Sequence, residues 1–142
     1  RADRAAFASL YARYAGRVYW YCYLRLGNRE LAEDATSLTF AKAFASFASC
    51  REDRFRPWLY SLARNVVTDV YRDRRDETPL DVAWNVADPA PSPEEIAIHQ
   101  ESHDAARVLL SRLPDKQRQI VELRLAGLTG AEIARVLGRS HV

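Results

Sequence analysis

The sequence has little cysteine and no long apolar run. Only two of its 142 residues are cysteine, and neither Cys22 nor Cys50 belongs to a C-x-x-C pair or has a neighbouring His. This pattern excludes a disulfide scaffold and a structural zinc site, and it makes the reducing cytoplasm the expected location. No apolar run approaches the ~20 residues that a membrane-spanning helix needs. No signal peptide is recognisable, so we expect no membrane partner.

The motifs of catalysis are also missing. There is no Gly-rich phosphate loop, no nucleophile with a matching base, and no carboxylate pair at helical spacing in an apolar setting. His99 and His103 have the i,i+4 spacing of metal ligands but lack a third ligand nearby. We therefore expect a protein that is not an enzyme and that binds no metal or cofactor. The chain begins at Arg1 rather than Met, as a fragment of a longer protein would.

Positive charge is absent from one segment and concentrated in two others, although the net charge is only +2. Residues 76–104 contain eight acidic side chains and no Lys or Arg, whereas basic side chains outnumber acidic ones by seven to four in residues 51–75 and by seven to three in residues 105–142. Two basic blocks joined by an acidic strap suggest nucleic-acid contact by the blocks and a different partner for the strap. The alternative is that the strap is a solvated linker.

Hydrophobic periodicity and capping residues predict an all-α protein. The expected helices span residues 3–26, 29–47 and 55–75, followed by helices that begin near Ser92, Pro114 and Thr129. We expect Gly27 and Gly138 to form turns, and Glu132 to complete a capping box with Thr129. The expected core positions of the second and fourth helices include Leu31, Ala35, Leu38, Phe44, Ala105, Val108 and Leu109.

The helix over residues 55–75 has the most informative pattern. An apolar stripe runs along it, and a polar edge lies beside that stripe, with Trp58 between the edge and the core. The edge consists of Ser61, Asn65, Thr68 and Arg72, and the helix ends in Arg74 and Arg75. Short polar side chains suit base contacts and arginines suit phosphates. Tyr60, Arg64, Tyr71 and Arg75 are expected on the opposite side. The alternative is an ordinary amphipathic helix with a solvated face.

Three segments resemble one family in the correct order. WLYSLARNVVTDVYRDRR resembles the promoter-melting segment, region 2.3 to 2.4, of the extracytoplasmic-function (ECF) sigma factors of bacterial RNA polymerase. AEDATSLTFAKAF resembles region 2.2, which binds the polymerase core. The carboxyl-terminal segment resembles region 4, because it matches L-P-x-x-x-R-x-x-x-x-L-R. The matching residues are Trp58, Leu59, Ala63, Arg64, Asn65, Asp69 and Arg72 in the first segment, and Leu113, Pro114, Arg118, Leu123 and Arg124 in the last.

The resemblance implies a set of site residues and partners. Core RNA polymerase would bind Asp34, Ser37, Thr39 and Phe40. The non-template strand of the promoter minus-ten element would bind Trp58, Ser61, Asn65, Thr68, Arg72, Arg74 and Arg75. An anti-sigma factor is a further partner that the family suggests. The implied domains are region 2 over residues 1–76, an acidic linker running into a helix over 77–104, and region 4 over 105–142, truncated before its recognition helix.

The implied function is promoter recognition, DNA melting and transcription initiation as a dissociable polymerase subunit. Two alternatives remain. LuxR-type regulators share the pattern G-L-T-x-x-E-I-A, so the chain could be a helix-turn-helix regulator that acts without polymerase. It could also be a helical interaction module with no role on DNA.

Overall fold

The structure, a computed structural model, describes residues 2–47, 54–76 and 93–139. These residues form six helices and no strand, which confirms the predicted all-α class. The helices are α1 (Ala2–Leu26), α2 (Arg29–Ala45), α3 (Phe55–Asp76), α4 (Pro93–Leu110), α5 (Asp115–Leu125) and α6 (Gly130–Arg139). Within this part of the chain, no helix combines the length and the apolarity that crossing a membrane would require.

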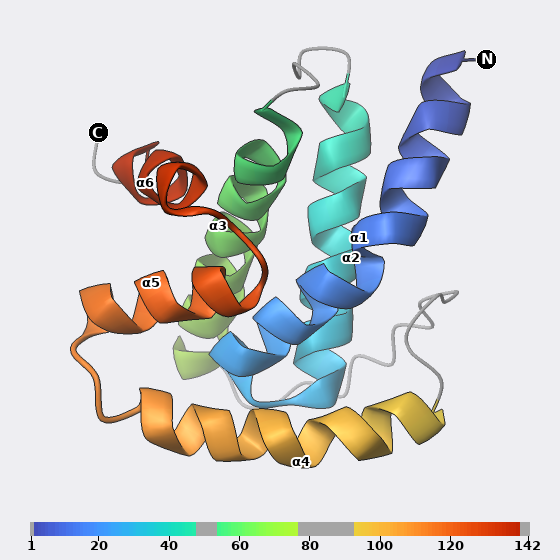
Figure 1. Ribbon diagram of the computed structural model, residues 1–142. Coiled ribbons are helices and arrows are strands. Elements are labelled where there is room, and N and C mark those ends of the chain that lie inside the picture. The colour runs from blue at the N-terminus through green and yellow to red at the C-terminus, as the bar shows by residue number, and fades with distance from the viewer. Residues whose placement is uncertain (1, 48–53, 77–92, 140–142) are drawn as a thin grey trace.

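The first three helices form an up-and-down bundle (Figure 1). Gly27 ends α1 with a positive φ of 68°, and the side chain of Asn28 then accepts a hydrogen bond of 3.0 Å from the backbone N–H of Leu31. This turn was predicted at the same residues, and it reverses the chain direction between α1 and α2. α4 lies across the end of the bundle where α1 stops, and α5 and α6 lie beside α3 (Figure 1).

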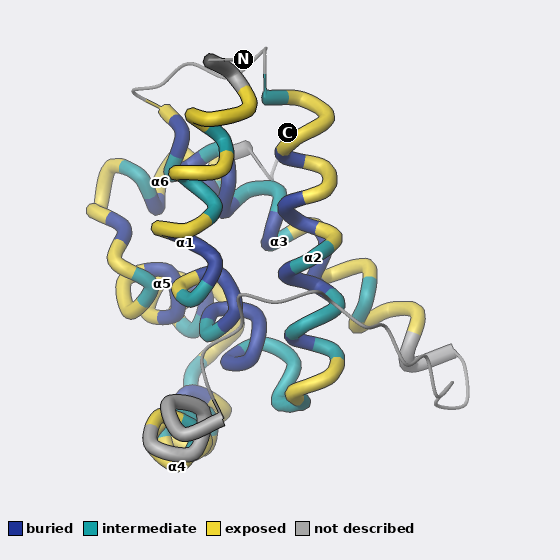
Figure 2. The backbone as a smooth tube through the Cα atoms, turned by 90° about the vertical axis from the view of Figure 1, so that its right-hand side faces the viewer, coloured by how far each residue is buried: buried dark blue, intermediate teal, exposed yellow. Residues whose placement is uncertain are grey.

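The second half of α1 is buried on nearly all sides (Figure 2). α2 and α3 cover it on one side, while α4 and α5 pack against it from the other. An α-helix that is apolar all round is stable only when it is covered all round. The covered side chains, none of them more than 4% exposed, are Val18, Tyr19, Tyr21, Cys22, Tyr23 and Leu24.

The predicted core face of α2 was wrong at two positions. Leu38 and Phe44 are 45% and 50% exposed. The buried face instead consists mainly of small side chains, namely Ala32, Ala35, Thr36, Thr39, Phe40 and Ala43. The hydroxyls of Thr36 and Thr39 donate to backbone carbonyls one turn earlier, each at 2.7 Å, so both can be buried without loss of a hydrogen bond.

The predicted inner face of α4 was also wrong. Ala105, Val108 and Leu109 are exposed, and Leu110 is buried in their place. α4 contacts α1 through polar and aromatic groups rather than through its larger aliphatic side chains. The imidazole of His103 stacks on the indole of Trp20 with 4.2 Å between ring centroids. Apolar periodicity in the sequence does not indicate a face of this kind.

The start of α6 was predicted correctly and its end was not. The backbone N–H of Glu132 donates to Thr129 Oγ1 at 3.2 Å, and the Thr129 N–H donates to Glu132 Oε1 at 2.8 Å, which completes the capping box. Gly138 does not form the expected turn, because α6 continues to Arg139. Among the described glycines, only Gly27 and Gly127 have the positive φ that such a turn uses.

The Gly27 turn should be sensitive to substitution. A Cβ atom at Gly27 would have an unfavourable φ and would collide with the guanidinium of Arg107 on α4. We expect Gly27→Ala to lower the free energy of unfolding by about 1–2 kcal/mol or more, since the left-handed conformation alone costs that much for an L-residue. Chemical denaturation of the variant provides the measurement.

Gly16→Ala is the matched control. Gly16 lies in the middle of α1, and a Cβ atom there would meet nothing within 4 Å. This substitution should therefore stabilise the protein by about 0.5–1 kcal/mol. Equal effects of the two substitutions would contradict the left-handed conformation of the turn at Gly27.

Candidate nucleic-acid interface

The predicted polar edge of α3 lies at the surface of the bundle. Asn65, Thr68 and Arg72 are exposed and Ser61 is half-buried. Trp58 is half-buried and packs against Phe55, with 5.8 Å between the ring centroids. The edge therefore extends over successive turns of one helix whose opposite side is packed in the core. A ligand on this edge would meet side chains on a rigid element.

The hydroxyl groups on this edge are not free donors. Ser61 Oγ donates to the carbonyl of Pro57 at 2.8 Å, and Thr68 Oγ1 donates to the carbonyl of Arg64 at 2.8 Å. Each hydroxyl has one proton, so only its oxygen lone pairs remain for a ligand. Asn65 has no hydrogen bond to the described residues, and its amide keeps both donor and acceptor capacity. Asn65 is therefore the best-equipped side chain on the edge for reading a base.

The arginines at the end of α3 are only partly described. Arg72 is exposed, and its Nη1 lies 3.9 Å from Asp69 Oδ1, an i,i+3 pair in which both side chains are more than half exposed. Such a pair contributes little, so Arg72 is available to a phosphate. Arg74 and Arg75 belong to α3, but their side chains lie outside the described residues.

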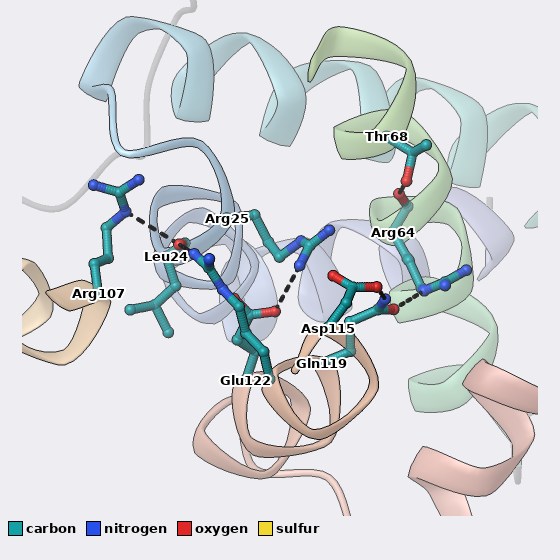
Figure 3. Close-up of polar contacts among 9 residues, drawn as sticks. Leu24, Arg25, Arg64, Thr68, Arg107, Asp115, Gln119 and Glu122 are labelled. Atoms are coloured by element: carbon teal, nitrogen blue, oxygen red, sulfur yellow. Dashed lines mark hydrogen bonds and ion pairs between the residues drawn. The ribbon is translucent and has the colours of Figure 1, made fainter. Parts of the chain in front are cut away.

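The opposite side of α3 is not the surface that the sequence predicted. Tyr60 is fully buried, and Arg64 Nε donates to Gln119 Oε1 of α5 at 2.6 Å (Figure 3). Tyr71 alone, at 56% exposure, lies in solvent as expected. α5 and α6 cover this side, a long-range contact that no periodicity within residues 55–75 could reveal.

The predicted polymerase-binding residues of α2 separate into two groups. Asp34 is half-buried and reaches the surface, whereas the hydroxyl oxygen of Ser37 is buried without a hydrogen-bond partner among the described residues. Thr39 and Phe40 do not reach the surface, since they are 0% and 4% exposed, and Phe40 packs edge-on against Tyr11 with 4.7 Å between ring centroids. A direct contact by these two side chains is therefore incorrect, because the bundle core already surrounds them. Leu38, which was predicted in the core and not at this surface, is exposed one helical turn after Asp34.

The carboxyl group of Asp34 has an unfavourable environment. Partial burial, together with the neighbouring carboxylates of Glu33 and Glu30, raises the pKa of Asp34 above its usual value. Its charge therefore destabilises the folded chain at neutral pH. A charged side chain that costs stability at a surface is a candidate for contact with a partner.

The described residues contain no group of three or more His, Cys, Asp or Glu side chains that could hold a metal ion. A cavity of about 760 Å³ lies between α1, α4 and the turn that precedes α6. Its walls include Arg17, Trp20, His103 and Gly127. They come from both halves of the chain, so the cavity exists only while these halves are in contact.

Comparison with protein families matches two parts of the chain. Residues 10–77 match Sigma-70 region 2, and residues 103–141 match Sigma-70, region 4. The first match contains α3 and its polar edge. The second contains the carboxyl-terminal part of α4, residues 103–110, and all of α5 and α6.

Several sigma factors are similar to this chain over most of its length. The ECF RNA polymerase sigma factor BldN of Streptomyces coelicolor is 36% identical over 96% of this chain and 53% of its own length. The ECF sigma factor SigW of Bacillus subtilis is 29% identical over 96% of this chain and 80% of its own length. The sigma factor CarQ of Myxococcus xanthus is 30% identical over 95% of this chain and 78% of its own length. The chain thus spans about half the length of BldN and about four fifths of the other two. With both regions matched in order, the chain belongs to the ECF group of the sigma-70 family of RNA polymerase sigma factors.

Proposed function

We propose that this chain is a regulatory, non-catalytic subunit that binds core RNA polymerase through α2 and captures a non-template base of the promoter minus-ten element on α3. The observation that carries the proposal is the polar edge of α3. On it Asn65 is exposed and makes no hydrogen bond to the described residues, between two hydroxyls whose protons are already donated.

DNA melting on this edge would be driven by binding alone. Unstacking a base costs a few kcal/mol, and stacking together with hydrogen bonds returns ~1–3 kcal/mol per captured base. Trp58 offers a half-buried ring beside the edge for stacking, and Asn65 offers an amide for the pairing edge of a base. Arg72, with Arg74 and Arg75, would neutralise the adjacent phosphates. Polymerase contacts would supply the remaining free energy.

The polymerase-binding surface would be centred on Asp34 and Leu38. Asp34 and Leu38 are one helical turn apart, so a carboxylate and an exposed aliphatic side chain point in the same direction. Exposed apolar groups beside charges are typical of a protein interface. The cytoplasm follows as the location, since the polymerase acts there. An anti-sigma factor remains a candidate partner. The acidic linker, whose residues 77–92 lie outside the described residues, would follow a cationic path in the polymerase.

Asn65→Ala should reduce discrimination at one base position of the minus-ten element by ~1–3 kcal/mol, the value of one good base contact. Arg72→Ala should weaken binding of all sequences equally. It should also reduce the slope of log K against log salt concentration by about one. Binding of the holoenzyme to single-stranded minus-ten oligonucleotides, with each base varied in turn at two salt concentrations, measures both effects.

The free energy of unfolding of the Asn65 variant distinguishes a side chain that reads a base from one that packs within the domain. Because Asn65 is exposed, its substitution should change the free energy of unfolding by less than about 0.5 kcal/mol. Phe40→Ala, at a buried ring, should cost about 3–5 kcal/mol. A base profile that is unchanged by Asn65→Ala, or a large loss of stability, would show that Asn65 does not read a base.

The charge of Asp34 should lower the free energy of unfolding and favour binding to polymerase. Asp34→Asn should raise the free energy of unfolding at pH 7, because the raised pKa means that the charged form is disfavoured in the folded chain. The gain should be full above the folded-state pKa and should vanish below the ordinary pKa of an unfolded Asp, where the parent is protonated in both states. Urea denaturation across this pH range gives the comparison.

Asp34→Arg should weaken binding to core polymerase by ~2 kcal/mol or more. The control is Glu101→Arg, the same reversal of charge at an exposed position of α4, which should bind like the parent. Equal affinities of the parent and Asp34→Arg in a titration would place the polymerase contact elsewhere. Failure of the parent itself to bind core polymerase would contradict the proposed function.

A further inference from the structure

The cavity between α1, α4 and the turn that precedes α6 has the size of a small-molecule site. Its volume of about 760 Å³ falls within the ~300–1,000 Å³ of typical ligand pockets. None of the residues that line it belongs to the polar edge of α3 or to the polymerase-binding surface proposed for α2. The cavity is therefore separate from both proposed contacts.

Cations and imidazoles line the cavity. Its walls include Arg17 of α1, Arg56 of α3, and His99 and His103 of α4. Among the described residues that line it, none is acidic, although the chain as a whole has 19 acidic side chains. A concave surface with cations on its walls focuses a positive potential and attracts anions. The charge of the lining thus favours an anionic ligand.

Arg17 is the cation best placed to hold such a ligand. Its side chain is exposed and makes no ion pair with any described residue. The guanidinium lies over the ring of Tyr14, 5.8 Å from the centroid, and a Cβ atom at Gly127 would be 3.7 Å from its Nη1. A contact with a ring face does not consume the N–H donors of a guanidinium. These donors remain for an anion beside the turn that precedes α6.

Arg56 adds a second guanidinium that is only partly engaged. Its Nε donates to Glu132 Oε2 of α6 at 3.0 Å, which uses one of the five N–H donors of the group. The carboxylate of Glu132 offsets much of the positive charge of Arg56, whereas the charge of Arg17 is not offset in this way. The walls therefore suit an anion of low charge that both guanidinium groups contact.

Stacked rings form another part of the lining. The imidazole of His103 lies on the indole of Trp20 with 4.2 Å between the centroids and 16° between the planes. His99 lies edge-on to the same indole at 6.0 Å. Trp20 and His103 are both half-buried, so a part of each ring is accessible. Flat rings of this kind pack well against another planar ring, and such stacking tolerates different heterocycles.

The position of the proton on His103 leaves one ring nitrogen for a ligand. Its Nδ1 lies 2.7 Å from the carbonyl oxygen of His99. A carbonyl oxygen can only accept, so Nδ1 carries a proton and donates in this contact. Nε2 is then an acceptor for the amino group of a heterocycle, or a donor when the imidazole is protonated.

We propose that this cavity binds a nucleoside phosphate, a small ligand that combines a planar heterocycle with an anionic group. The phosphate contacts Arg17 and the remaining N–H groups of Arg56. The base packs on the rings of Trp20 and His103. The site is independent of the proposed function, because its occupancy is measurable on the isolated chain without polymerase or DNA.

Isothermal titration calorimetry of the chain with ADP, in the absence of Mg²⁺, tests the site. ADP should bind saturably to a single site. Adenosine lacks the phosphates and pyrophosphate lacks the ring, so each should bind about tenfold more weakly than ADP. Absence of saturable binding at about 1 mM ADP, or equal affinities for ADP and pyrophosphate, would overturn the proposal.

Two substitutions of arginine on α1 make the result specific. Arg17→Gln should weaken ADP binding by about tenfold, the effect of losing one charge-assisted hydrogen bond. Arg13→Gln is the matched control and should bind like the parent, since Arg13 is exposed one turn earlier on α1 and does not line the cavity. Equal affinities of the two variants would show that Arg17 does not hold the phosphate and would overturn the site.

A third variant fills the cavity without removing a charge. Ala106 of α4 is half-buried and lines the cavity, so Ala106→Phe should place a ring in the space of the ligand and abolish ADP binding. Thermal melting of each variant confirms that it is folded. A folded Ala106→Phe variant that binds ADP like the parent would show that the ligand lies outside the cavity.

Nuclear magnetic resonance locates the ligand on the chain. The indole N–H signal of Trp20 should shift on addition of ADP, whereas the signal of Trp58, beside the polar edge of α3, should not. A shift of the Trp58 signal alone would place ADP on the edge proposed to read a base and would overturn the cavity site. A single-stranded oligonucleotide that shifts the Trp20 signal at a lower concentration than ADP would also overturn it, because the cavity would then hold a nucleic-acid chain.

Discussion

The rest of the structure depends on the requirement that the second half of α1 be covered on all sides. Tyr19, Tyr21, Tyr23 and Leu24 point in different directions around the helix, and each is at least 96% buried. α2 and α3 can cover only part of this surface. α4 and α5 cover the remainder, so the sequence of one helix requires contact between the two family regions. The face of α4 toward α1 is aromatic and polar because it covers this helix. His103 packs on an aromatic ring of α1, and Arg107 donates to a backbone carbonyl of α1.

The two proposed binding surfaces of region 2 remain accessible in this arrangement. The edge with Asn65 and the α2 surface with Asp34 both reach solvent, while Arg56 and Arg64 of α3 contact region 4. α3 therefore presents three distinct environments around its axis: an apolar side in the bundle, a polar edge in solvent, and a charged side against α5 and α6. With region 4 in this position, the proposed base-reading residues stay uncovered.

Local features were predictable from the sequence, and long-range contacts were not. The turn at Gly27 and Asn28 and the capping box of Thr129 were found correctly, because each depends on a few adjacent residues. The polar edge of α3 was found because helical geometry alone places it. Leu38 was assigned to the core because it is a large apolar residue at helical spacing, and Thr39 was placed at the surface by the family resemblance, the reverse of their positions. The bond from Thr39 to its own helix allows its hydroxyl to be buried. The partners of Arg25, Arg56 and Arg64 lie 55 to 97 residues away along the chain, and no local pattern indicates them.

The unpaired hydroxyl of Tyr60 has a consequence for stability. The ring lies edge-on to Tyr21 of α1 with 5.5 Å between the centroids, and the hydroxyl is buried without a hydrogen-bond partner among the described residues. A buried donor without an acceptor is a cost that the folded chain carries and the unfolded chain does not, since water satisfies the group once the chain unfolds. One phenolic oxygen on α3 thus reduces the free energy of unfolding that burial of its own ring provides.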